Sequence, residues 1–248
     1  MNRQLHGARL FHPSSARRTI LGVWAHPDDE AFLSGGFMAQ AVRAGHRVVV
    51  ATATRGEGGT PDPEEFPPDV LARIREAELA NSLEVIGVAE HIWLDGDLKD
   101  GSLDQVPLSV GAGAVSDVMD RVQPDLVVTF GPDGLTGHSD HQAVSQWVTA
   151  ASEGRERTHD VWHAALTQDF LDRWGDLCDQ QGVWMSNTPP RPRDKAALVH
   201  VQRCDNDIAK RKFAALRAHT SQTAGLIERV GAKTFENWWG EEAFAAAI

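Results

Sequence analysis

Short apolar runs alternate along the chain with longer segments in which apolar residues recur every three or four positions. Each run contains β-branched side chains and is followed by glycine or polar residues, a pattern typical of strands buried on both faces of a parallel sheet. The predicted strands cover residues 18–25, 46–54, 91–95, 124–131, 161–166 and 196–201. The spacing between them predicts helices over residues 28–45, 69–87, 106–122 and 205–219, and another that ends near residue 152.

Strands that alternate with helices predict an α/β fold. Gly45 and Gly87 stand where two of the helices would end, and the glycine- and proline-rich residues 55–68 form a loop. We therefore expect a single-domain, Rossmann-like three-layer sandwich with a mostly parallel sheet over residues 1–248, with residues 1–17 as an N-terminal extension. Right-handed crossovers would bring the strand ends to one edge, where such folds bind ligands.

Composition excludes some classes of function. The formal net charge of -11 argues against a basic surface, so we expect neither nucleic acid nor a membrane as partner. Cys178 and Cys204 show no C-x-x-C spacing, which disfavours a disulfide framework or a thiolate zinc site and predicts buried thiols in a reducing compartment. The N-terminus lacks the apolar core of a signal peptide, and no apolar run approaches the ~20 residues of a membrane span. We expect a cytoplasmic protein.

Four titratable side chains directly follow the first predicted strand, in GVWAHPDDEA (22–31). Neighbouring residues in a turn cannot both point the same way, so Asp28 and Asp29 are suited to separate tasks. His26 and Asp29, with Pro27 stiffening the turn between them, can reach a common point. The alternative is that one aspartate only caps the following helix, and this segment alone does not decide between the two.

A second cluster, GHSDHQAV (137–144), stands at the start of the helix that follows the strand at 124–131. The spacing places His138 and His141 on neighbouring positions of one turn. A charged histidine is unfavourable at a helix N-terminus, so two neutral ones are suited to metal ligation or catalysis, although one could be a solvated helix-end residue. Together the clusters supply two histidines and a carboxylate, the donor set of a catalytic zinc site with room for water.

The pairing of AHPDDE (25–30) with GHSDH (137–141) resembles the PIG-L/LmbE-type family of zinc-dependent N-acetylglucosaminyl deacetylases. The similarity extends over roughly residues 18–225. Weaker supporting matches are TRGEGG (54–59), REAELANSLEVIGV (75–88) and KRKFAALRAHTSQ (210–222). The resemblance implies one Zn²⁺ per chain and a small-molecule glycoside as substrate, although the donor set also accepts iron(II) or cobalt.

The same resemblance implies a role for each polar residue of the two clusters. Asp28 would be the general base, and His138 would stabilise the oxyanion or protonate the leaving amine. Asp140 would orient a histidine from outside the ligand set. The metal ligands would be His26, Asp29 and His141. These roles agree with the chemistry, because amide hydrolysis at neutral pH needs an activated water and an acid for the amine.

Further polar residues are candidates with open alternatives. Arg55 and Glu57, in the loop after the second strand, are predicted to bind substrate, since arginine can bind sugar hydroxyls or a phosphate; the alternative is a surface pair. Arg75 and Glu78 match family positions, but an exposed helix pair would look the same.

For a glutamate, a histidine and two tryptophans, the choice between a site residue and a structural residue stays open. Glu30 could be an active-site carboxylate or only favour the helix dipole, and His219 could line the cleft or pack. Trp24 or Trp93 could offer a stacking platform for a sugar, although tryptophans more often pack in the core. The chain has no tyrosine, so oxyanion stabilisation would fall to His138 and the metal.

We therefore expect a metal-dependent amide hydrolase that removes an acetyl group from an N-acetylglucosamine-type substrate. An amidase acting on a larger mycothiol-type conjugate stays open as an alternative. A metallophosphoesterase would need more ligands, and a non-catalytic metal- or sugar-binding protein is disfavoured because Asp28 and His138 are both present. Residues 235–248 are apolar enough to form an interface, so a homo-oligomer is also open.

Overall fold

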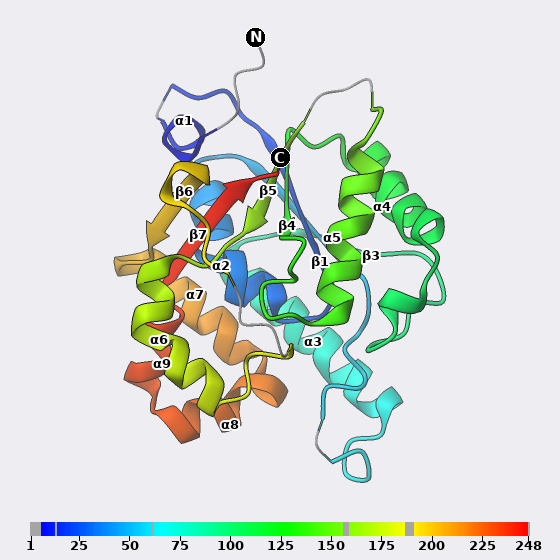
Figure 1. Cartoon of the computed structure of the whole chain (residues 1–248), viewed down its shortest axis with the longest axis vertical. Coiled ribbons are helices and arrows are strands. Elements are labelled where there is room, and N and C mark those ends of the chain that lie inside the picture. The colour runs from blue at the N-terminus through cyan, green and yellow to red at the C-terminus, as the bar shows by residue number, and fades with distance from the viewer. Residues whose placement is uncertain (1–5, 13, 61, 156–158, 187–190, 248) are drawn as a thin grey trace.

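The fold is built on one mixed, mostly parallel sheet. The computed structural model describes residues 6–12, 14–60, 62–155, 159–186 and 191–247. Within them the sheet has seven strands in the order β3-β2-β1-β4-β5-β7-β6 (Figure 1). The strands are β1 (Thr19–Trp24), β2 (Arg47–Thr52), β3 (Glu90–Trp93), β4 (Leu126–Phe130), β5 (Asp160–Ala164), β6 (Leu198–Arg203) and β7 (Glu241–Ala246). All neighbours from β3 to β5 pair in parallel, whereas β7 is antiparallel to both β5 and β6.

Helices cover both faces of the sheet. On one face, α4 (Leu108–Val122) and α5 (Ser139–Ser152) pack on β1 and on each other; on the other face, α2 (Asp29–Arg43) packs on β1, β2 and β7 and contacts α3 (Pro68–Ile86) and α7 (Asn206–Ala218). Figure 1 shows α4 and α5 on the opposite side of the strands from α7. The other helices are α1 (Gly7–Leu10), α6 (Gln168–Gln180), α8 (Thr220–Val230) and α9 (Ala232–Trp238), with short 3₁₀ turns at Leu103–Gln105 and Lys195–Ala197. The predicted three-layer α/β sandwich is confirmed.

The C-terminal segment, which could have offered an apolar interface, packs into the core in its described part. α9 and β7 bury apolar side chains of residues 235–247 within the chain. Phe235, Trp238 and Phe244 are each 0% exposed. The reason is that β7 fills the place between β5 and β6, so its apolar side chains join the core.

Part of the predicted N-terminal extension also packs on the core. Leu10, at the end of α1, is 1% exposed, and its carbonyl oxygen lies 3.0 Å from Nε2 of His46. Phe11 packs edge-on against Phe37 of α2, with 5.6 Å between ring centroids.

Two expectations from composition concern thiols and membranes. Cys178 and Cys204 are both free and buried, as predicted, and burial raises the pKa of the two thiols to about 11 and about 12 respectively. In the part of the chain that the structure describes, no helix combines the length and apolar character needed to cross a bilayer.

The strand order fixes where a ligand can bind. Neighbouring strands β1 and β4 lie at the point where the chain changes winding direction, with β2 and β3 on one side and β5 on the other. Open α/β sheets bind ligands outside the strand ends at such a switch point. The two polar clusters follow β1 and β4 at this edge.

Candidate active site

The turn after β1 separates the two adjacent aspartates. Asp28 occupies the position before α2 with a φ of +112°, and its side chain makes no capping hydrogen bond. Asp29 begins the helix, and its Oδ2 accepts a hydrogen bond of 2.8 Å from the backbone N–H of His26. The Asp28 carboxylate instead lies 3.3 Å from Nη2 of Arg75. Neither aspartate is therefore a simple helix cap.

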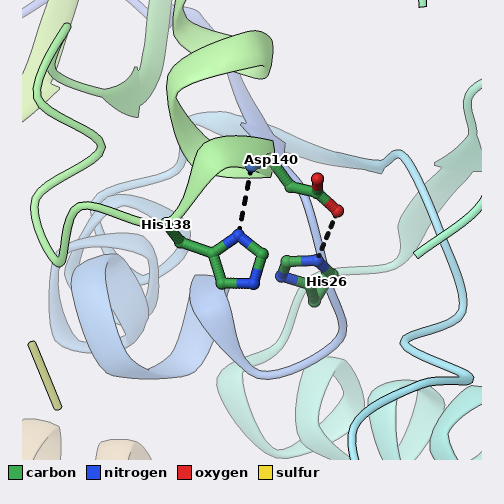
Figure 2. Close-up of side chains that lie close together, drawn as sticks. All are labelled: His26, His138 and Asp140. Atoms are coloured by element: carbon green, nitrogen blue, oxygen red, sulfur yellow. Dashed lines mark hydrogen bonds and ion pairs between the residues drawn. The ribbon is translucent and has the colours of Figure 1, made fainter. Parts of the chain in front are cut away.

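The second cluster begins with a close backbone approach at Gly137. Its φ is +83°, and a Cβ there would lie 2.3 Å from Cβ of Ser186, so glycine is required. His138 does cap α5, because its Nδ1 accepts a 3.1 Å hydrogen bond from the backbone N–H of Asp140 (Figure 2). Nδ1 is thus an acceptor, and the neutral ring carries its proton on Nε2.

Three predicted ligands from the two clusters meet in one buried group. The donor atoms of His26, Asp29 and His141 all lie within 4.8 Å of one another. Nε2 of His141 is 3.3 Å from Oδ1 of Asp29, and Nδ1 of His26 is 3.6 Å from Oδ2. Nδ1 of His141 faces the carbonyl oxygen of Gly134 at 3.0 Å and can only donate to it, which leaves the lone pair on Nε2 toward Asp29.

Carboxylates outside this group hold the far side of His26. Its Nε2 lies 2.9 Å from Oδ1 of Asp100 and 3.3 Å from Oδ2 of Asp140, so it carries a proton and Nδ1 is left to face Asp29. Asp140 also accepts hydrogen bonds from the backbone N–H groups of Gly101 and Leu103. A carboxylate behind a ligating histidine is the usual support of a metal site.

A second group of donors, His26, His138 and Asp140, also lies within 4.8 Å. The Asp140 carboxylate is already used by two backbone amides and by His26. The first group, formed by His26, Asp29 and His141, therefore fits a divalent ion better, and the chemistry of its donors, two imidazole nitrogens and a carboxylate, suits zinc and similar metals.

Burial and neighbouring charges shift the ionisation of these groups. Burial raises the pKa of Asp28 to about 6, although the Arg75 guanidinium opposes it. Burial also disfavours the charged form of Asp29, but His141 and His26 outweigh it and hold the pKa of that carboxyl well below its usual range. Burial lowers the pKa of His141 to about 4, so this ring is neutral at pH 7. Burial also disfavours the charged form of His26, but its hydrogen bonds to Asp100 and Asp140 outweigh burial and raise its pKa, so a metal ion bound there would displace a proton from this ring. Burial likewise lowers the pKa of His138.

A cavity of about 350 Å³ opens beside this group. Its lining combines polar side chains, among them Asp28, Asp29 and His138, with apolar ones such as Phe32 and Trp239. This volume is in the range of small-molecule sites. The cavity is therefore lined by His26, Asp29 and His141, the three candidate metal ligands, and also by His138.

The predicted substrate-binding residues Arg55 and Glu57 are not among the described residues that line this cavity. Arg55 lies over the ring of Trp93, 4.6 Å from its centroid, and 3.7 Å from the Glu76 carboxylate. Oε1 of Glu57 accepts a hydrogen bond from the backbone N–H of Asp100. Arg55 therefore pairs with Glu76 and not with Glu57, the partner in the alternative that the sequence left open.

Tryptophan enters the cavity at a position that sequence patterns did not single out. Trp24 is 0% exposed and packs edge-on against Phe130, and Trp93 carries Arg55. Trp239, after α9, lines the cavity and packs against Phe32 with 4.7 Å between ring centroids. Neither of the two tryptophans near strand ends is thus a platform in this cavity.

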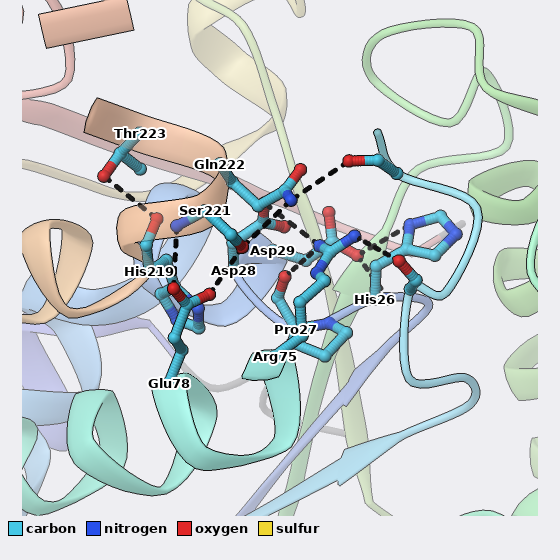
Figure 3. Close-up of polar contacts among 12 residues, drawn as sticks. His26, Pro27, Asp28, Asp29, Arg75, Glu78, His219, Ser221, Gln222 and Thr223 are labelled. Atoms are coloured by element: carbon cyan, nitrogen blue, oxygen red, sulfur yellow. Dashed lines mark hydrogen bonds and ion pairs between the residues drawn. The ribbon is translucent and has the colours of Figure 1, made fainter. Parts of the chain in front are cut away.

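Arg75 and Glu78 are buried on α3 and are not an exposed pair. Arg75 donates hydrogen bonds to the carbonyl oxygens of Pro27, at 2.5 Å, and Gly56, at 2.8 Å. Glu78 accepts hydrogen bonds from both the backbone N–H and the hydroxyl of Ser221 (Figure 3). These two side chains therefore fix the turn after β1 and the start of α8 to the same helix.

Asp100 is a polar site residue that sequence reasoning also missed. It lies in the irregular segment between β3 and α4, where DGDLKDG offers several acidic residues and no motif. Burial raises its pKa, but the hydrogen bond to His26 outweighs that and lowers the pKa to about 2. Only the tertiary fold singles out this carboxylate from its neighbours.

Fold and site together define a class: an α/β protein whose sheet edge holds a divalent-metal donor set beside a substrate-sized cavity. Residues 21–152 match the PIG-L family, described as GlcNAc-PI de-N-acetylase. The chain belongs to this family.

Curated relatives and solved structures extend the comparison. A 1D-myo-inositol 2-acetamido-2-deoxy-alpha-D-glucopyranoside deacetylase of Kineococcus radiotolerans is 36% identical over 55% of this chain, which matches 46% of that protein's length. An equally named protein of a Mycobacterium species is 31% identical over 82% of the chain and 73% of its own length. The N,N'-diacetylchitobiose deacetylase of Pyrococcus horikoshii has the same fold, with a TM-score of 0.61, 20% identity, and coverage of 93% of this chain and 84% of that one.

Proposed function

We propose that this chain is a zinc-dependent deacetylase that hydrolyses the N-acetyl amide of an N-acetylglucosamine glycoside. The observation that carries the proposal is the buried group His26, Asp29 and His141 with the separate carboxylate of Asp28 beside it in one cavity. The names of the curated relatives support the substrate class.

The three buried donors would hold one metal ion per chain. A divalent ion bound there would lower the pKa of a water molecule and polarise an amide carbonyl. Asp100 and Asp140 fix the His26 ring through Nε2, so that Nδ1 stays directed at Asp29. His141 is fixed in the same way by the Gly134 carbonyl.

Asp28 is the general base in this proposal. Its carboxylate lines the cavity but belongs to no group of donors that could hold a metal among the described residues. It is therefore available to accept a proton from the attacking water. Arg75, 3.3 Å away, keeps the carboxylate oriented. Once protonated, Asp28 is also the group placed to return the proton to the leaving amine.

His138 stabilises the oxyanion. Because its Nδ1 accepts the Asp140 amide hydrogen, its Nε2 carries a proton that can be donated to a substrate oxygen. A neutral ring held in this tautomer has no second proton to give to the amine. Of the two roles implied by the resemblance, the geometry thus favours oxyanion stabilisation over proton donation.

The experiment is a deacetylation screen with the zinc-loaded protein. N-acetylglucosaminyl-inositol, simple alkyl N-acetylglucosaminides and a mycothiol-type conjugate are compared, and the free amine is measured. We expect amine release from at least one N-acetylglucosaminide. Release only from the conjugate would make the protein an amidase, and phosphate release from phosphoesters together with two metal ions per chain would contradict the proposal.

The role of Asp28 is tested by replacing it without disturbing the ligands. Asp28→Asn is expected to keep one zinc per chain by elemental analysis and to lower kcat by about 10²- to 10⁴-fold, the range of general acid–base catalysis. Asp207→Asn, an exposed aspartate on α7, is the matched control and should retain full activity. Unchanged turnover in Asp28→Asn would exclude Asp28 as the base.

A further inference from the structure

The backbone of Asp28 is held in a conformation that residues with a Cβ rarely adopt. Its φ is +112° and its ψ is -30°. Such backbone strain persists only where the surroundings impose it. The contacts that impose this backbone conformation also set the direction of the Asp28 side chain, because the side chain is attached to the same Cα.

The backbone amide of Asp28 is held by a buried carboxylate. Its N–H donates a 2.9 Å hydrogen bond to Oε2 of Glu30, which is 0% exposed. The other oxygen, Oε1, accepts hydrogen bonds from the hydroxyl of Ser82, at 2.9 Å, and from Nε2 of His219, at 2.8 Å. Glu30 thus ties α2 to Ser82 on α3 and to the junction between α7 and α8, where His219 lies.

The contact that His219 makes is with the Glu30 carboxylate and not with the cavity. His219 is 0% exposed and is not among the described residues that line the cavity. Its near neighbours Ser221 and Gln222 make hydrogen bonds to α3 and to the loop after β2, respectively (Figure 3). Within the described part of the chain, Nδ1 of His219 has no hydrogen-bond partner. A fully buried ionisable pair contributes little net stability, which points to a positional role for the His219–Glu30 contact.

We propose that His219 is a positioning residue that acts through Glu30 to hold the Asp28 amide and so to aim the Asp28 carboxylate. The inference rests on the proposed function for the role of Asp28 in the reaction. The structural part, that His219 and Glu30 impose the backbone conformation of Asp28, can be tested without any activity.

The first test measures hydrogen exchange of the Asp28 amide by NMR in the metal-free protein. His219→Ala and Glu30→Ala are expected to speed this exchange at least about tenfold. Glu30→Gln should preserve protection, because its amide oxygen still accepts the hydrogen bond and His219 can move its proton to the unpartnered Nδ1. His163→Ala is the matched control: His163 is also a buried histidine whose Nε2 lacks a partner in the described residues, but it lies on β5, outside the cavity lining.

The second test separates positioning from stability by kinetics. With a substrate from the deacetylation screen, His219→Ala should lower kcat by about 10- to 100-fold while zinc content and KM stay near wild type. Glu30→Gln should stay within a few-fold of wild type. His163→Ala should change the melting temperature without lowering kcat. If His219→Ala does not fold, His219→Phe keeps the ring volume and removes the donor.

Two results would overturn the inference: unchanged Asp28 exchange in the His219 variants, or a loss of activity that follows the melting temperature equally in His219 and His163 variants. A wild-type protein that deacetylates nothing would refute the proposed function instead. The exchange measurement would still decide the structural part.

Discussion

Adjacent residues Asp28 and Asp29 have different environments because the helix begins between them. Asp29 has helical geometry and turns its carboxylate to His26 and His141, whereas Asp28 has a positive φ and faces Arg75. In the proposed function, Asp29 would therefore bind the metal ion, whereas Asp28, which faces Arg75, would not. Identical side chains at neighbouring positions are not interchangeable here.

This division predicts opposite metal-binding behaviour of two matched variants. Asp29→Asn should lower zinc affinity by more than about 100-fold, since the loss of an outer partner of a ligand already costs about 10- to 100-fold. Asp28→Asn should bind zinc within a few-fold of wild type. Competition titration with a chromogenic chelator measures both. Equal loss of affinity in the two variants would show that both aspartates are ligands.

A buried histidine away from the site predicts how stability depends on pH. Burial lowers the pKa of His163 to about 4, with a smaller contribution from Arg193. Between pH 6.5 and pH 4 the unfolded state binds a proton that the folded state does not, so the stability contributed by neutral His163 is present above pH 6.5 and is lost as pH falls through this window. At pH 5 the loss is roughly 2 kcal/mol.

His163→Gln isolates this contribution, because the other histidines titrate alike in both proteins. Urea unfolding of wild type and variant at pH 7.5, 6 and 5 gives the two curves. The difference in unfolding free energy between them should shrink as pH falls. A constant difference across this range would mean that His163 is not held neutral by the fold.

At the scale of elements, α2 is fixed from its side by a buried ion pair. Lys212 on α7 and Glu242 on β7 are both 0% exposed and 2.6 Å apart. Nζ of Lys212 donates to the carbonyl oxygen of Phe32, and the Glu242 carboxylate accepts hydrogen bonds from the backbone N–H groups of Gly36 and Phe37. Because Phe32 lines the cavity, this pair also holds one wall of the site.

Removing one partner of the Lys212–Glu242 pair is expected to cause a large loss of stability. Lys212→Met leaves the buried Glu242 carboxylate without its cation and should lower the free energy of unfolding by about 3–5 kcal/mol. Arg211→Met removes the exposed neighbouring pair with Asp207 and should change it by less than about 1 kcal/mol. Urea denaturation compares the two. Equal effects would mean that the buried pair is not a fixed part of α2.

Two helix glycines predict effects of opposite sign. A Cβ on Gly36 of α2 would lie 2.2 Å from Sγ of Cys204, whereas a Cβ on the exposed Gly113 of α4 meets nothing within 4 Å. Gly36→Ala should therefore destabilise by roughly 1–3 kcal/mol despite the better helix propensity of alanine. Gly113→Ala should stabilise by about 0.5–1 kcal/mol. Thermal unfolding of both variants checks the signs, and a stabilised Gly36→Ala would contradict the close packing of α2 on Cys204.

Helices and strands whose apolar residues follow one clear pattern along the chain could be predicted from the sequence, and the others could not. The parallel strands β1, β2 and β4 are continuous apolar runs, and their bounds agree within one or two residues. β7, with the sequence EEAFAA, was missed because two glutamates and three alanines give no strand period. Glu242 is nevertheless buried, since backbone amides of α2 and Lys212 satisfy its charge.

At the scale of the molecule, a bound metal would join two parts of the chain that are distant in sequence. The donors come from the end of β1 and the start of α5, so binding favours the folded state. Saturation at 100 times the dissociation constant adds about 2.7 kcal/mol to stability. Removing the metal with a chelator should therefore lower the melting temperature, and zinc should restore it. An Asp29→Asn protein should show no such response.

The site was predictable only as far as residues cluster in the sequence. The two clusters were expected to meet because both follow parallel strands of one sheet, and the family resemblance implied His26, Asp29 and His141 as the ligands. Asp100 was missed and Arg75 was left open as an exposed helix residue, because both acquire their contacts only when α3 and the segment before α4 close around the turn after β1. Long-range packing of this kind leaves no local pattern.

The position of β7 has a consequence for how the protein matures during translation. β6 leaves the ribosome before β7, yet β6 reaches the rest of the sheet only through β7. Until residues 241–246 emerge, β6 has no edge to join and Lys212 has no counter-ion. The half of the molecule next to β3 can form early, while the wall of the cavity that depends on α2 being pinned is completed only after residues 241–246 have emerged.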